Sequence, residues 1–400
     1  MALSSYTPTE GFVADPYMDL EVYDPAADLL TLNLGPQHPS THGVFRILLH
    51  LDGETIIKAV PYPGYLHRGV EKLCEKLAYV QITPIVDKND YVSPMNNEQA
   101  VCMAFEKMLK VEVPARAQYL RTIVSELTRI QSHLLWLGTF CIDLGGALGG
   151  GSSIFLYCFR ERELILGLFE QLTGCRFHYN THTIGGNRHD IPEGWARKVR
   201  LTVDHIEGRI REYETLLDHP ILLKRTQGVG TLDGELAMEL GITGPNLRAS
   251  GVDFDLRRDS PYHIYEQLNV NVAVERGGDC YARYRVRVRE MQESIRLVKE
   301  LIDNVPEGPL TGYKPVRTPG QAKVKAGTRA YACIETPRGE LGTYVVGGGD
   351  NKGACPYRLK IRPPSLHAVS CLPYVLPTHN MSDAIAILGS LDPIMGEVDR

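Results

Sequence analysis

The chain has 400 residues, a hydrophobic fraction of 43% and a charged fraction of 23%, values typical of a globular protein with a sizeable core. Its 43 Lys and Arg residues against 48 Asp and Glu residues give a formal net charge of -5, which argues against nucleic acid as a main partner. No window approaches the roughly 18 consecutive apolar residues of a membrane span, so we expect that the chain does not cross a bilayer by itself.

The N-terminal stretch and the cysteines bear on the cellular compartment. The first residues are acidic and have neither the segments of a secretory signal nor the arginines of a transit peptide, which predicts a cytosol-facing protein. The nine cysteines are scattered and never spaced as Cys-x-x-Cys. This spacing predicts reduced thiols and argues against an iron–sulfur or zinc site ligated by this chain alone.

The N-terminal part of the chain is predicted to be rich in strands. Residues 1–28 contain many Pro and Asp residues and predict an extended arm. Residues 29–63 form three strand-like runs, and Asp52-Gly53 between the last two is a hairpin signal.

The rest of the chain is predicted to be a helical core followed by a mixed part. Apolar residues recur at helical spacing over residues 64–304, starting at Tyr65 and including a long helix that Pro114 opens. Residues 305–330 are rich in Pro, Gly and Lys and predict a linker or lid. Residues 331–400 predict a small sheet and a short helix, so the whole chain is assigned to the α+β class.

The segment Gly-Pro-Gln-His-Pro-Ser-Thr-His-Gly contains His38 and His42 in a loop held by prolines and glycines. Pro39 argues against a continuous helix, and the glutamate of the two-histidine zinc motif is missing, so that motif is excluded. From the residues alone, this loop is either functional or a turn whose imidazoles cap backbone groups.

Other polar segments are less informative by themselves. Arg68 lies on a charged helix face, Tyr91 ends a polar loop that begins at Asp87, and Asp143 precedes a run of five glycines within residues 145–151. The glycine-rich run lacks the Lys-Ser/Thr of a P-loop and does not fit Gly-x-Gly-x-x-Gly, so nucleotide binding is rejected. The apolar tail is expected to be buried, with Arg400 held by a carboxylate.

Taken together, the motifs resemble the D subunit of respiratory NADH–quinone oxidoreductase, complex I, over nearly the whole chain. The segments with this resemblance are GPQHPSTHG, GYLHRGVEKL, LTRIQSHLLWLG, FRERE, LRASGV, RVREMQESI, PRGELG and SLDPIMGEVDR. The family is related to the large subunit of nickel–iron hydrogenases, which hold their metals with two paired-cysteine motifs. This chain lacks such pairs, so the resemblance favours the quinone-reducing branch with a hydrogenase-like α+β fold.

The resemblance implies a peripheral-arm subunit of a proton-pumping NADH:quinone oxidoreductase on the cytoplasmic side of the cell inner membrane. It implies a quinone headgroup site formed with the B subunit, whose terminal [4Fe–4S] cluster passes electrons to quinone. Quinone is then the substrate, and this chain ligates no cofactor. The implied partners are the B, C, H and I subunits, with membrane contact only through the complex.

The resemblance also assigns roles to single residues. His38 corresponds to the histidine that bonds one quinone carbonyl, Tyr91 to the tyrosine that bonds the other, and Asp143 to the aspartate that orients His38. His42 is a further quinone-binding residue. Arg68 corresponds to the arginine beside the cluster.

His178 likewise corresponds to the redox-linked histidine near the cluster. The chain departs from the family at Lys88, Asn89, Thr183 and the glycine-rich run at 145–151. Three alternatives remain open: a related complex fed by ferredoxin or reduced deazaflavin, a hydrogenase large subunit, and a scaffold subunit with a decayed quinone pocket.

Overall fold

The computed structural model describes residues 29–145, 151–316, 318, 321–349 and 353–400. The arm predicted for residues 1–28 and the glycines at 146–150 lie outside the described residues. The described part mixes helices with small antiparallel sheets, so the fold is α+β, as the sequence predicts.

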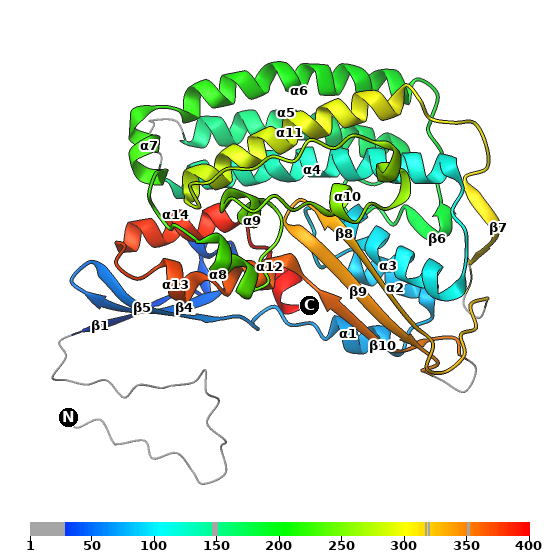
Figure 1. Cartoon of the computed structure of the whole chain (residues 1–400), viewed down its shortest axis with the longest axis horizontal. Helices are drawn as coiled ribbons and strands as arrows, with labels where there is room; N and C mark the ends of the chain where they lie inside the picture. The colour runs from blue at the N-terminus through cyan, green and yellow to red at the C-terminus, as the bar shows by residue number, and fades with distance from the viewer. Residues whose placement is uncertain (1–28, 146–150, 317, 319–320, 350–352) are drawn as a thin grey trace, which may run out of the picture.

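Four long helices form the centre of the fold. They run side by side in Figure 1: α4 (Ala115–Asp143), α5 (Gly151–Thr173), α6 (Trp195–Leu217) and α11 (Cys280–Ile302). Pro114 immediately precedes α4, and the Asp279 carboxylate caps α11 by accepting from the Ala282 amide at 2.8 Å. The apolar stripe predicted for α4 is buried throughout, at Leu120, Ile123, Leu127, Ile130, Leu134 and Leu137.

Helix α4 also buries charged side chains, which requires partners because an unpaired buried charge is costly. Glu126 lies 3.2 Å from the guanidinium of Arg257, and His133 Nε2 lies 2.9 Å from Glu290. These pairs fix α4 against the short helix α10 (Leu256–Asp259) and against α11.

Two three-stranded antiparallel sheets flank the helices. The first has the order β1-β4-β5, formed by β1 (Leu30–Leu34), β4 (Arg46–Asp52) and β5 (Thr55–Tyr62), and its hairpin turns at Asp52-Gly53 as predicted. The second has the order β10-β9-β8 and is formed by β8 (Arg329–Thr336), β9 (Gly339–Gly347) and β10 (Pro356–Arg362).

Two short strand pairs complete the sheet structure. Strand β2 (Gln37–His38) pairs with β3 (Gly43–Val44), and β6 (His182–Asn187) pairs with β7 (Thr311–Val316). Strand β7 falls in the segment that composition assigned to a linker or lid. Its partner is remote in the chain, so the local sequence pattern does not reveal it.

The remaining helices connect these units, and most of them are short apart from α3 and α14. The helix predicted from Tyr65 begins only at Val70, because Gly69 has φ +65° and ends the preceding turn. The remaining helices and 3₁₀ turns of the described residues are α1 (Val70–Cys74), α2 (Tyr79–Val86), α3 (Pro94–Leu109), α7 (Pro220–Thr226), α8 (Gly234–Glu239), α9 (Pro245–Ala249), α10 (Leu256–Asp259), α12 (Pro364–Val369), α13 (Leu372–Val375), α14 (Met381–Leu391), α15 (Met395–Asp399), η1 (Pro39–Thr41) and η2 (His263–Gln267).

The C-terminal tail lies inside the molecule, as predicted. Helix α15 is buried, and Figure 1 shows the C-terminus in the middle of the fold beside α12. Arg400 donates to the carbonyl of Ile361 at 2.9 Å and lies 3.8 Å from the carboxylate of Glu71. Asp399 accepts from the backbone N–H groups of Gly64 and Leu66 before α1, and Asp392 lines a cavity at the end of α4, where the candidate site lies.

Candidate functional site

A cavity of about 270 Å³ collects side chains from four separate segments. The η1 loop contributes His42, the loop after α2 contributes Tyr91, the end of α4 contributes Asp143, and the α14–α15 connection contributes Asp392. The cavity therefore combines an imidazole, a phenol and carboxylates with a largely apolar wall. The other lining residues are Pro39, Val92, Leu135, Thr139, Ile142, Pro393 and Ile394.

His42 and Asp143 form a close ion pair at this cavity. His42 Nε2 lies 2.6 Å from Asp143 Oδ2, and the two side chains are 14% and 8% exposed. Burial opposes charging of the imidazole, but the hydrogen bond and the charge of Asp143 outweigh it and raise the pKa of His42. Gly389 packs so closely that a Cβ atom there would lie 2.5 Å from Asp143 Oδ2.

His38 lies in a different environment, and this corrects one expectation. Its side chain is exposed and its Nδ1 accepts from the backbone N–H of Ser40 at 3.2 Å, as the cap of η1. The expectation that Asp143 orients His38 is wrong in this structure, because the carboxylate binds His42. A single turn separates the two histidines, and only the second one faces the cavity.

Tyr91 brings a phenol to the cavity while remaining 36% exposed. Burial raises the pKa of Tyr91, and the charges of Asp90 and Asp392 add to this against the opposing charge of Arg338. The hydroxyl therefore stays protonated at neutral pH and can donate a hydrogen bond. The ring also contacts Phe177, with centroids 6.4 Å apart.

Arg338 holds the Tyr91 loop and the C-terminal tail together. Its guanidinium lies 2.7 Å from the Asp90 carboxylate and 3.3 Å from the Asp392 carboxylate, and all three side chains are buried. Sequence reasoning missed this clamp, although Arg338 lies in the motif PRGELG. No local sequence pattern indicates this contact, because Asp90 and Arg338 are 248 positions apart in the chain.

A second group of expected residues lies on the other side of the same loop. Arg68 donates to the backbone carbonyl of Lys88 at 3.0 Å and to the Asn89 side chain at 3.4 Å. His178 Nδ1 lies 3.4 Å from Asp87 Oδ2. Burial lowers the pKa of His178, and the positive charges of Lys88 and Arg68 lower it further. The loop from 87 to 91 thus links Arg68, Lys88 and His178 to the cavity, which Tyr91 lines.

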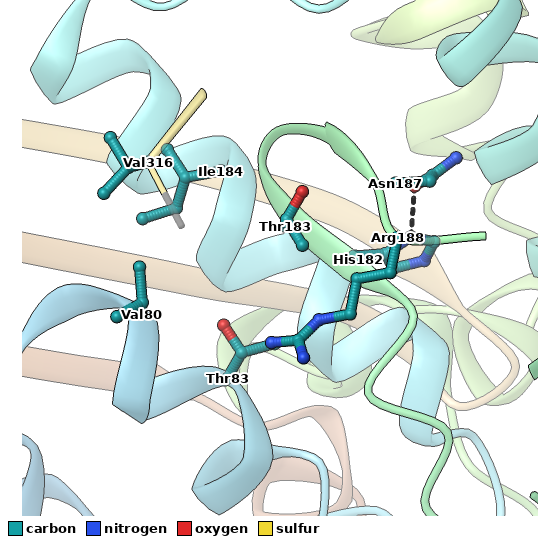
Figure 2. Close-up of a pocket in the computed structure, with 8 residues that line it drawn as sticks. All are labelled: Val80, Thr83, His182, Thr183, Ile184, Asn187, Arg188 and Val316. Atoms are coloured by element: carbon teal, nitrogen blue, oxygen red, sulfur yellow. Dashed lines mark hydrogen bonds between the residues drawn. The ribbon is translucent and has the colours of Figure 1, made fainter. Parts of the chain in front are cut away.

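Thr183 lies in a separate cavity of about 250 Å³, which shares no lining residue with the first. Figure 2 shows the Arg188 side chain extending across it toward Thr83, with His182 hydrogen-bonded to Asn187 at 2.9 Å. The departure at Thr183 therefore leaves the lining of the His42 cavity unchanged.

Within the described ranges, no group of three or more His, Cys, Asp or Glu side chains is arranged to hold a metal ion. In that same part of the chain, no helix is long and apolar enough to span a membrane. The fold and the site define an α+β protein with a helical core and a cavity equipped for hydrogen bonding and proton transfer.

Comparison with known proteins assigns the family. Residues 149–400 match the family model described as respiratory-chain NADH dehydrogenase, 49 Kd subunit. The NADH-quinone oxidoreductase D 2 subunit of Rhizobium etli (strain CIAT 652) is 46% identical over 392 residues, covering 92% of this chain and 95% of the relative. The D subunit of Geobacillus kaustophilus is 45% identical, covering 92% and 98%, and that of Methylacidiphilum infernorum is 44% identical, covering 94% and 93%.

The chain belongs to the 49 Kd, or D-subunit, family of respiratory-chain NADH dehydrogenases, and is thus a subunit of an oxidoreductase complex. The resemblance drawn from the motifs is confirmed.

Proposed function

We propose that this chain forms the quinone headgroup site of a proton-pumping NADH:quinone oxidoreductase together with the cluster-bearing B subunit. The observation that supports the proposal most is the meeting of the His42–Asp143 pair and the Tyr91 phenol at one cavity. A quinone has two carbonyl oxygens that gain negative charge during reduction and then take up two protons. Two preorganised donors at one cavity match that demand.

The role of each residue in this proposal follows from the chemistry of its side chain. Tyr91 donates a hydrogen bond to one carbonyl oxygen, while protonated His42 donates to the other and releases its proton there. Asp143 fixes the tautomer of His42 and favours its charged form. The apolar side chains of Leu135 and Ile142 offer a contact surface for the quinone ring.

Electrons would reach the quinone from a [4Fe–4S] cluster held by the neighbouring subunit. The basic group formed by Arg68 and Lys88 supplies positive charge suited to the surface that faces such a cluster. We place the chain in the peripheral arm, on the cytoplasmic side of the inner membrane, in contact with the B, C, H and I subunits.

Two histidines four positions apart provide a matched test. In membranes with the assembled complex, His42→Ala should lower NADH:quinone reduction about 100-fold or more, the usual loss when a general acid is removed. Electron transfer from NADH to a hydrophilic artificial acceptor should remain. His38→Ala should leave both rates near normal, because its exposed imidazole caps η1 and does not line the cavity.

A normal rate of quinone reduction in the His42→Ala variant would contradict the proposed site and favour a scaffold role for the chain. An equal loss of quinone reduction and of reduction of the artificial acceptor would instead indicate a defect of assembly, which a native gel detects directly.

A further inference from the structure

Two buried carboxyl groups meet behind the loop that ends in Tyr91. Asp87 closes α2 and Glu98 lies in the second turn of α3, and they are 1% and 0% exposed. Their carboxyl groups are in hydrogen-bonding contact. Yet Asp87 Oδ1 and Glu98 Oε1 have no hydrogen-bond donor among the described residues.

Two ionised carboxylates cannot satisfy this arrangement. Each carboxylate oxygen only accepts hydrogen bonds, so two ionised groups would repel each other and leave both buried oxygens unsatisfied. One added proton removes both problems, since a carboxylic acid O–H donates to the facing carboxylate.

The outer oxygens of the pair have fixed surroundings. Glu98 Oε2 accepts the backbone N–H of His182 at 2.8 Å, with the amides of Asn180 and Thr181 also directed at this carboxyl group. Asp87 Oδ2 lies 3.4 Å from Nδ1 of His178, whose side chain is 31% exposed. The pair is therefore closed toward the core and faces a partly exposed imidazole on its outer side.

The surrounding charges agree with one shared proton at neutral pH. Burial raises the pKa of Asp87 to about 7 against the opposing charge of Lys88. Burial and the charge of Asp87 raise the pKa of Glu98, although the backbone amides oppose this rise. Arg121 acts on Glu98 from α4, but its charge is already paired with Glu106 at 2.7 Å. Tyr179 and Cys102, which also face the pair, are neutral because burial raises the pKa of each.

We propose that Asp87 and Glu98 share one proton and exchange it with solvent through His178, as a proton store beside the quinone site. The O–H bond of the acid breaks as an N–H bond forms at Nδ1 of His178, and an N–H bond on the solvent side of the imidazolium then breaks as water takes that proton. The pair of carboxylates left behind is transient, because a proton taken up by the reverse path restores the acid. The use of this proton in quinone reduction rests on the proposed function, while the shared proton itself does not.

Infrared spectroscopy of the intact complex tests the shared proton without quinone turnover. The wild type should show a carbonyl band of a protonated carboxylic acid at neutral pH that shifts in D₂O and disappears at alkaline pH, because the pKa of Glu98 is raised by burial and by the charge of Asp87. Glu98→Gln keeps an acceptor for the His182 amide and a donor toward Asp87, so the fold should survive while the band is lost.

Asp87→Asn should remove the same band, and the double variant should lose nothing further. Glu300→Gln, at an exposed ion pair near the end of α11, is the control that should leave the band intact. A band that survives Glu98→Gln, two separate bands, or no band at acidic pH in the wild type would overturn the shared proton.

The exchange route has its own test. His178→Phe should keep the band but slow its shift after transfer to D₂O. An unchanged exchange rate would overturn the role of His178. Because these spectra need no quinone, they can fail while the His42 and His38 comparison succeeds, and the reverse also holds.

Discussion

Replacing Asp143 by Asn examines the centre of the candidate site with almost no change in shape. The substitution keeps a group that can accept from His42 but removes the negative charge 2.6 Å from the imidazole. Since burial alone lowers the pKa of a histidine, the pKa of His42 should fall once the charge is gone.

The size of the effect follows from the bond that is weakened. A hydrogen bond to a charged group contributes roughly 1.5–3 kcal/mol. Because about 1.4 kcal/mol corresponds to a factor of ten, quinone reduction at neutral pH should fall roughly 10- to 150-fold. The activity that remains should rise toward acidic pH, where the lowered pKa of His42 again allows protonation.

The assay compares NADH:quinone reduction with reduction of a hydrophilic acceptor across a pH series, in membranes whose complex content is matched. The stability of the chain offers a second readout with a defined sign. Because the pKa of His42 is raised in the folded state, its stabilising effect is complete below the unfolded pKa of about 6.5 and is lost as the pH rises through the folded value. An unchanged rate and pH profile in Asp143→Asn would refute the reasoning.

Three further substitutions probe the surroundings of the site. Tyr91→Phe removes the phenol donor, so quinone reduction should fall at least about 10-fold with NADH oxidation by the hydrophilic acceptor unchanged, and equal rates would place the headgroup elsewhere. Gly389→Ala puts a Cβ 2.5 Å from Asp143 Oδ2 and should reduce quinone activity, whereas Gly208→Ala, with open space around it in α6, should be neutral or stabilising. Arg257→Met removes one of the two arginines that pair with each of the buried carboxylates Glu126 and Asp255, and should lower the free energy of unfolding by about 3–5 kcal/mol, measured by denaturant titration, with a loss below about 1 kcal/mol contradicting the pairing.

Several features of this protein follow directly from the sequence. The apolar spacing of α4 and α11 predicts long helices, and Asp52-Gly53 predicts a hairpin, because these signals act between neighbours in the chain. The ordered set of motifs, more than any single one, identified the family. The family resemblance also named Tyr91, Asp143 and His42 as candidate site residues, and all three line the cavity.

Only the tertiary structure decided which groups work together. The sequence offered two histidines in one loop, and the fold gives Asp143 to His42 because η1 turns His38 outward. It also joins Arg338 to Asp90 and brings together the buried carboxyl groups behind the Tyr91 loop. The His42–Asp143 and Arg338–Asp90 pairs join segments that are remote in sequence, and the pKa values of His42, Asp87 and Glu98 shift only because the fold buries these groups beside their neighbours. Local pattern fixes periodicity and turns, whereas pairing of buried charges depends on the packed three-dimensional arrangement.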